Sequence, residues 1–118
     1  MWSRRPRLPV ENYVGSVAAL LTFCTSGRRR VFTEPSVVMP TWTQILRAAA
    51  ATHVEVLAYC FMPDHVHLVV TTTDTTADLS RFVRLAKQLS GFAYSRHAGT
   101  RLWQPSWHDR LLRKQMTL

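Results

Sequence analysis

Apolar residues follow two different periods along the chain, and their succession predicts the order of secondary structure. Residues 14–24 form a nearly unbroken apolar run that ends in β-branched and aromatic residues, as is typical of a buried strand. Between residues 41 and 53 the apolar positions recur every three or four residues, which predicts a helix starting at Pro40 or Thr41. Residues 54–61 and 65–72 predict two strands joined by a short Met-Pro-Asp turn, and therefore a hairpin.

The second half of the chain repeats the alternation. Asp78 is a plausible N-cap for a second amphipathic helix that runs to about Ser95, and residues 102–112 are expected to be extended. The order strand, helix, strand, strand, helix, strand predicts an α+β fold of the ferredoxin-like split β-α-β type, a four-strand antiparallel sheet with two helices on one face. We expect residues 1–12 to form a basic arm and residues 13–118 to form the single domain.

The charge balance narrows the class of partner. Fifteen Lys and Arg residues oppose seven Asp and Glu residues in the 118-residue chain, for a formal net charge of +8, and most of the cations are arginines. A guanidinium group binds two phosphate oxygens at once and stays charged. We therefore expect a polyanionic partner, with nucleic acid favoured over an anionic membrane.

Cysteine usage and hydropathy bear on location. Cys24 and Cys60 lie in apolar runs, where we expect buried free thiols, and no stretch has the length of a membrane span. The basic start followed by an apolar run is also similar to a secretory signal, but Pro9, Glu11 and Asn12 interrupt it and no small-residue cleavage pattern follows. We expect a cytoplasmic, nucleoid-associated protein with no membrane contact.

Two histidines form the candidate chemical centre. In a strand of period two, His65 and His67 point to one face, while Val66, Leu68 and Val70 point to the other. Two neutral imidazoles at this spacing can bind one divalent cation and leave its other coordination positions for water and substrate, as in catalytic sites. A solvated polar strand surface would show the same pattern, so the pair alone leaves both interpretations open.

The surrounding sequence resembles a known family. Residues 59–70 read Tyr-Cys-Phe-Met-Pro-Asp-His-Val-His-Leu-Val-Val, which resembles the His-hydrophobic-His signature of the HUH single-tyrosine transposases, and most closely the REP-associated tyrosine transposases. Residues 21–28 with Phe32, residues 78–82 and residues 102–113 are similar to further parts of that family. The resemblance spans roughly residues 16–113.

This resemblance implies a concrete reaction. Members cut single-stranded DNA beside imperfect hairpins, with Mg or Mn held by two histidines and a third polar ligand, so His65 and His67 would be the metal ligands here. The metal polarises the scissile phosphate and a tyrosine oxygen attacks phosphorus, which leaves a covalent 5′-phosphotyrosine and a free 3′ hydroxyl. Relatives are dimers through sheet edges, which implies a homodimer.

The sequence also departs from the family. The nucleophilic tyrosine of relatives lies on a helix after the Leu-Trp-Gln strands, and no residue of this sequence matches it, so we expect a chain truncated ahead of that helix. Tyr94 is the remaining candidate nucleophile, since Tyr13 adjoins the basic arm and Tyr59 is expected to pack in the sheet or core. The third metal ligand is equally open. Its candidates are Asp64, His108 and Asp109.

DNA binding depends less on that helix. Trp103 or Trp107 could stack on bases. The cations expected to flank a single strand are Arg28, Arg29, Arg30, Arg81, Arg84, Lys87, Arg96 and Arg101. The alternative function is therefore a catalytically inactive transposase remnant that only binds DNA. Two hydrolytic alternatives are an endonuclease that uses a metal-activated water and a histidine-triad nucleotide hydrolase. The second is disfavoured because Val69 occupies the place of its next histidine.

Overall fold

The structure, a computed structural model, describes residues 17–74 and 76–114. Its elements are β1 (Val17–Cys24), the short 3-10 turns η2 (Ser26–Arg28) and η3 (Val31–Thr33), α1 (Pro35–Ala51), β2 (Val54–Met62), β3 (His65–Thr72), α2 (Leu79–Ala98) and β4 (His108–Lys114). The expected basic arm, Tyr13 and the first residues of the expected opening strand lie outside the described residues.

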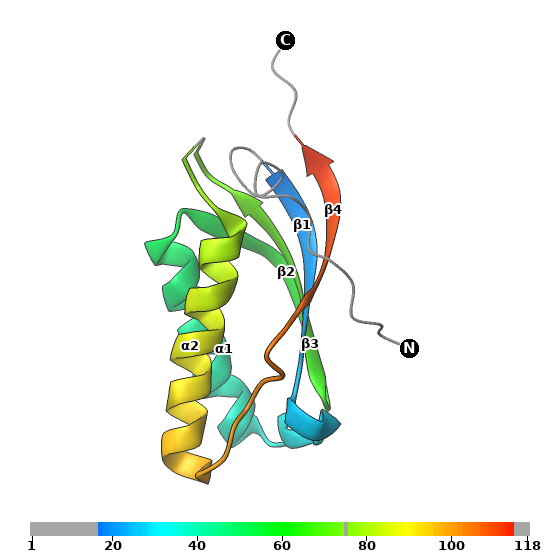
Figure 1. The fold of residues 1–118 in the computed structure, drawn as a ribbon, viewed down its shortest axis with the longest axis vertical. Helices are drawn as coiled ribbons and strands as arrows, with labels where there is room; N and C mark the ends of the chain where they lie inside the picture. Colours follow the sequence, from blue (N-terminus) through cyan, green and yellow to red (C-terminus); the bar gives the residue numbers. More distant parts are fainter. Residues whose placement is uncertain (1–16, 75, 115–118) are drawn as a thin grey trace.

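The four strands form one sheet in the order β2-β3-β1-β4, and every neighbouring pair is antiparallel. Both helices cover the same face of this sheet, as Figure 1 shows. The predicted α+β fold with the split β-α-β connection is thus confirmed. The two central strands, β1 and β3, are hydrogen-bonded on both sides, and β2 and β4 form the edges.

Strand alternation decides which side chains form the core. The odd-numbered positions of β1 and the even-numbered positions of β3 point under the helices and are almost completely buried: Val17, Ala19, Leu21, Phe23, Val66, Leu68 and Val70. From the helices they meet Ile45, Ala48, Leu79, Phe82, Val83 and Ala86. The remaining positions of these strands point to the opposite side of the sheet. We call this side the open face; it carries Thr22, His65 and His67 and, by register, Cys60 and His108.

The predicted start of the first helix was wrong. The helix begins at Pro35, where a proline at the first position needs no amide hydrogen, and the carbonyl of Glu34 accepts hydrogen bonds from Val37 and Val38. Pro40, expected at the start, lies inside the helix on an exposed side. Its ring therefore costs one backbone hydrogen bond without displacing core residues.

The second helix begins as predicted and ends slightly later. Asp78 caps it by accepting a hydrogen bond from the Ser80 amide at 2.9 Å. The helix continues past Ser95 to Ala98, because Gly99 adopts a left-handed conformation (φ 75°) and donates its amide to the Ser95 carbonyl. No helix of the described ranges is long and apolar enough to cross a membrane.

The last strand is shorter than expected. Residues 102–107 run alongside α2 and make a single bridge, Trp103 to Thr25, before β4 begins at His108. The burial of two indoles explains this path. Trp103 is 4% exposed, Trp107 is 7% exposed, and the Trp103 indole donates to the Ser90 hydroxyl on α2 at 2.9 Å. Packing of these rings under the helix therefore replaces strand pairing, and it removes both from the surface where bases could stack.

Candidate functional site

The two histidines of β3 converge on the open face. Their Nε2 atoms lie 3.2 Å apart, and the rings meet edge to face at 79°. Two nitrogens that each bind the same ion at about 2.1 Å, at roughly a right angle, are separated by about 3 Å. The separation of the two Nε2 atoms is that of a hydrogen bond between the rings, and it also matches the separation of two nitrogens that share one divalent cation.

The other nitrogen of each ring is also held. Nδ1 of His65 is hydrogen-bonded to the Asp64 carboxylate at 2.8 Å, and Nδ1 of His67 is hydrogen-bonded to the Thr22 hydroxyl at 2.9 Å. Partners of this kind fix the orientation and tautomer of a ligating imidazole. Thr22 went unrecognised in the sequence, because it lies on β1, 45 positions away from His67, and only the β1–β3 register places it there.

An arginine closes the site from the turn after β1. Gly27 and Arg28 both have positive φ, 64° and 53°, and this turn directs the Arg28 guanidinium to Asp64, with both nitrogen–oxygen distances at 3.0 Å. The hydrogen bond with His65, and then that from Arg28, lower the pKa of Asp64 below its usual value. Burial, and then the charge of His65, lower the pKa of His67. A charged carboxylate thus stands behind one imidazole, and the other favours its neutral, metal-binding form.

The structure does not bring the candidate third ligands onto the pair. Within residues 17–74 and 76–114, no three side chains of His, Cys, Asp or Glu gather closely enough to hold an ion. His108 lies opposite Thr22, one strand away from His67, and Asp109 points under the helices, where it is buried. Asp64 turns its Oδ1 to the back of His65. The described site is therefore a two-nitrogen site with open positions.

The cysteines differ from each other, contrary to the prediction that both are buried. Cys24 is buried, and burial is the main reason that its pKa is raised. Cys60 is exposed, because it lies on the edge strand β2 and faces the open side beside His67. Its sulfur contacts that of Met62, at 3.8 Å.

The predicted DNA-binding cations separate into two groups. Lys87 points inward and donates to the carbonyls of Gln104 at 2.6 Å and Ser106 at 2.9 Å, so its ammonium holds the chain ahead of β4. Arg29 is partly buried and donates to the carbonyls of Ser26 and Arg101. The remaining six are exposed: Arg28, Arg30, Arg81, Arg84, Arg96 and Arg101.

The described tyrosines lie on the helix side of the sheet. Tyr94 packs against the core and, with Thr41 and His97, lines a hollow between α2 and α1. Tyr59 stacks on Trp42 of α1, with ring centroids 3.9 Å apart. The histidine pair is on the opposite, open face, so the structure does not bring Tyr94 to it.

Comparison with known proteins agrees with this architecture. The model of the IS200-like transposase family matches residues 13–112. A solved REP-associated tyrosine transposase bound to a REP hairpin has 19% identity and a TM-score of 0.73, with 97% of this chain and 64% of that chain covered. A candidate transposase from Deinococcus radiodurans R1 has 23% identity and a TM-score of 0.69, with 95% and 88% covered. At these identities the structures show a shared fold, and this chain spans less than two thirds of the REP-associated protein. No curated protein matches the chain in sequence.

The family match extends over most of the 118 residues and includes both the histidine pair and the turn that carries Arg28. Fold and sequence therefore lead to the same assignment. The chain belongs to the IS200-like family of transposases.

Proposed function

We propose that this chain holds a divalent cation, Mg or Mn, between His65 and His67 and acts with it on single-stranded DNA next to a hairpin. The observation that carries the proposal is the 3.2 Å separation of the two Nε2 atoms, with both Nδ1 atoms held from behind. The hairpin in the REP-associated structure supports the choice of substrate.

The residues around the pair have distinct parts in this proposal. Asp64 and Thr22 orient the imidazoles, so both Nε2 lone pairs are available together. A bound cation supplies Lewis-acid polarisation of the scissile phosphate. Arg28 keeps 43% of its side chain exposed while it pairs with Asp64, and its remaining N–H groups are free of that pair and can bind a neighbouring phosphate.

The proposed reaction is nicking and rejoining through a phosphotyrosine intermediate. A tyrosine oxygen forms a bond to phosphorus, and the bond from phosphorus to the 3′ oxygen breaks, which releases a 3′ hydroxyl that can reverse the step. Tyr59 and Tyr94 lie across the sheet from the histidine pair. We therefore place the nucleophile outside the described residues.

A gel assay tests this proposal. Labelled single-stranded hairpin DNA is incubated with the protein and Mn, and the products are separated under denaturing conditions. We expect a cut strand and a protein–DNA adduct that disappear in His65→Ala, in His67→Ala and with chelator. Both should persist in His53→Ala, which alters an exposed histidine in the turn before β2. Cleavage that persists in both site variants would refute the role of the pair, and cleavage without adduct would indicate a metal-activated water.

The placement of the described tyrosines favours one alternative function, DNA binding without cleavage. In that case the same assay gives neither cut strand nor adduct, while a native gel shows retarded hairpin DNA.

A homodimer through a sheet edge also stays a prediction. The edge strands available for it are β2 and β4, and analytical ultracentrifugation of the protein measures it.

A further inference from the structure

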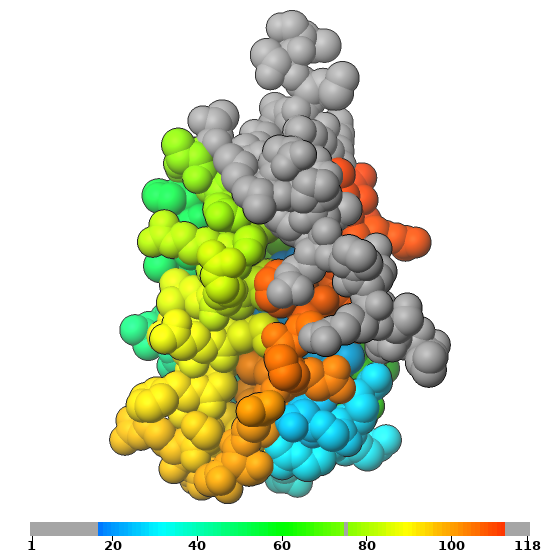
Figure 2. Space-filling model, in the orientation of Figure 1, coloured from blue at the N-terminus to red at the C-terminus, as the bar shows by residue number. Residues whose placement is uncertain are grey.

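A groove runs between α2 and residues 99–107, away from the histidine pair. It has a volume of about 800 Å³, within the range of ligand sites. Its lining contains the cations Arg84, Lys87 and Arg101 and no acidic side chain, and Phe92 is its exposed ring, whereas Trp103 and Trp107 border it as buried side chains. Figure 2 shows the two walls side by side, with the turn after β1 next to them. We call it the α2 groove. Its cationic lining suits an anionic ligand.

The wall formed by α2 exposes an aromatic ring. Phe92 is 63% exposed, although large apolar side chains of this chain are mostly in the core. The guanidinium of Arg96 lies over this ring, 5.7 Å from its centre. An exposed ring next to a cation is the combination with which proteins bind single-stranded nucleic acid, the base on the ring and the phosphate on the cation.

One turn connects the α2 groove to the histidine pair. On one side the amide of Thr25 donates to the Asp64 carbonyl at 3.0 Å, and Arg28 pairs with the Asp64 side chain. On the other side the amide of Ser26 donates to the Leu102 carbonyl at 2.8 Å, and Arg29 donates to the carbonyl of Arg101. Residues 25–30, which we call the basic turn, therefore contact both places at once.

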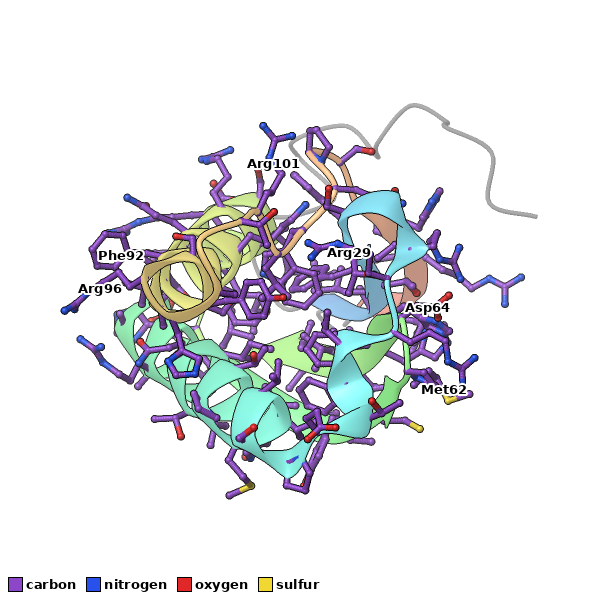
Figure 3. All side chains as sticks on the ribbon, turned by 90° about the horizontal axis from the view of Figure 1, so that it is seen from below. Arg29, Met62, Asp64, Phe92, Arg96 and Arg101 are labelled. Carbon is purple, nitrogen blue, oxygen red and sulfur yellow. The ribbon has the colours of Figure 1, made fainter. Side chains whose placement is uncertain are left out.

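The cations are arranged along this connection. In Figure 3, which views this end of the molecule, Asp64 lies at one side, Arg29 and Arg101 lie between, and Phe92 and Arg96 lie at the other side. The exposed Arg30 belongs to the same turn. Arg29 holds the carbonyls of Ser26 and Arg101, so it links the basic turn to the groove. The guanidinium groups exposed to a negatively charged chain along this connection are those of Arg28, Arg30, Arg101 and Arg96.

We propose that a DNA single strand held at the histidine pair crosses the basic turn and places an unpaired base in the α2 groove against Phe92, with Arg96 and Arg101 on the adjoining phosphates. This inference rests on the proposed function. It adds a second contact with the substrate strand, distant from the phosphate that is cut, which sets the minimum length of single strand that the protein binds tightly.

Binding of unstructured oligonucleotides of increasing length, measured by fluorescence anisotropy in Mn, tests the inference, and these strands carry no hairpin beside which the proposed cleavage would occur. We expect wild-type affinity to rise in a step once the strand spans from the pair to the groove. Phe92→Ala should lower the affinity for long strands roughly 5- to 150-fold and leave short strands unaffected. Arg96→Ala and Arg101→Ala should each reduce the slope of log affinity against log salt by about 0.7.

Two surface variants serve as matched controls. Met39→Ala removes an apolar side chain that is also largely exposed, and Arg47→Ala removes an exposed cation, both on α1 and outside the groove. Equal DNA affinity of Phe92→Ala and wild type at every strand length would overturn the inference. An equal loss of affinity in Met39→Ala and Arg47→Ala would also overturn it, as would a Phe92→Ala protein that changes its oligomeric state but not its DNA affinity. Loss of binding in wild type at all lengths would instead refute the proposed function.

Discussion

Replacing Thr22 with valine removes a single hydroxyl from behind the histidine pair. Thr22 is 1% exposed, so water has no access to replace the 2.9 Å hydrogen bond to Nδ1 of His67. The methyl group fills nearly the same volume, and the strand keeps a β-branched residue. Loss of such a partner costs about 10- to 100-fold in metal affinity. That corresponds to about 1.4–2.7 kcal/mol of binding free energy.

Calorimetric titration with Mn measures this effect, and thermal unfolding of the same samples verifies that Thr22→Val is folded. Thr71→Val is the control. Thr71 lies on the same face of the sheet as His67, but its hydroxyl donates to the neighbouring Thr72 carbonyl and not to a histidine. We expect weaker Mn binding for Thr22→Val alone. A folded Thr22→Val protein with wild-type Mn affinity would refute the reasoning that Thr22 orients His67.

Three further predictions concern other parts of the chain. Lys87→Met should lower the free energy of unfolding in urea by about 2 kcal/mol, because it deletes charge-assisted hydrogen bonds to two carbonyls, whereas the exposed Arg81→Met should change it little. A lower salt slope of DNA binding in Lys87→Met would instead show a phosphate contact. A thiol reagent should label Cys60 rapidly and the buried Cys24, with its raised pKa, only after unfolding; equal rates would contradict the fold. The lowered pKa of His67 means that the unfolded chain takes up a proton there first, so the contribution of His67 to stability is complete above pH 6.5 and is lost as the pH falls from 6.5 toward the lowered value. The free energy of unfolding in urea, measured on both sides of pH 6.5, should fall less in His67→Gln than in wild type. An equal fall in both proteins would refute the lowered pKa of His67.

Local patterns were sufficient for most of the fold. The period-two run of β3 placed Val66 under the helices and both histidines on the opposite face, because side-chain direction in a strand depends only on position parity. Asp78 predicted the start of α2, since a cap acts through adjacent backbone amides. These features involve residues close together in the sequence.

The remaining features depend on contacts between distant segments. Thr22 becomes a partner of His67 only through strand register, and Lys87 becomes a tether because Trp103 and Trp107 bury beneath α2 and bring the carbonyls of residues 104 and 106 to it. Charge alone therefore placed Lys87 among the DNA contacts. The start of α1 was predicted wrongly at Pro40 because a local rule fitted two places. Pro35, five residues earlier, equally satisfies the preference for proline at the first position of a helix.

The central claim is that His65 and His67 together hold a divalent cation. The most direct measurement is the NMR spectrum of the histidine side chains during addition of Mn, whose paramagnetism broadens the signals of nearby nuclei. The account predicts that His65 and His67 broaden first and together, while the exposed His53, in the turn before β2, and His97, on α2, stay sharp. Equal broadening of all histidines, or none at the pair, would contradict it.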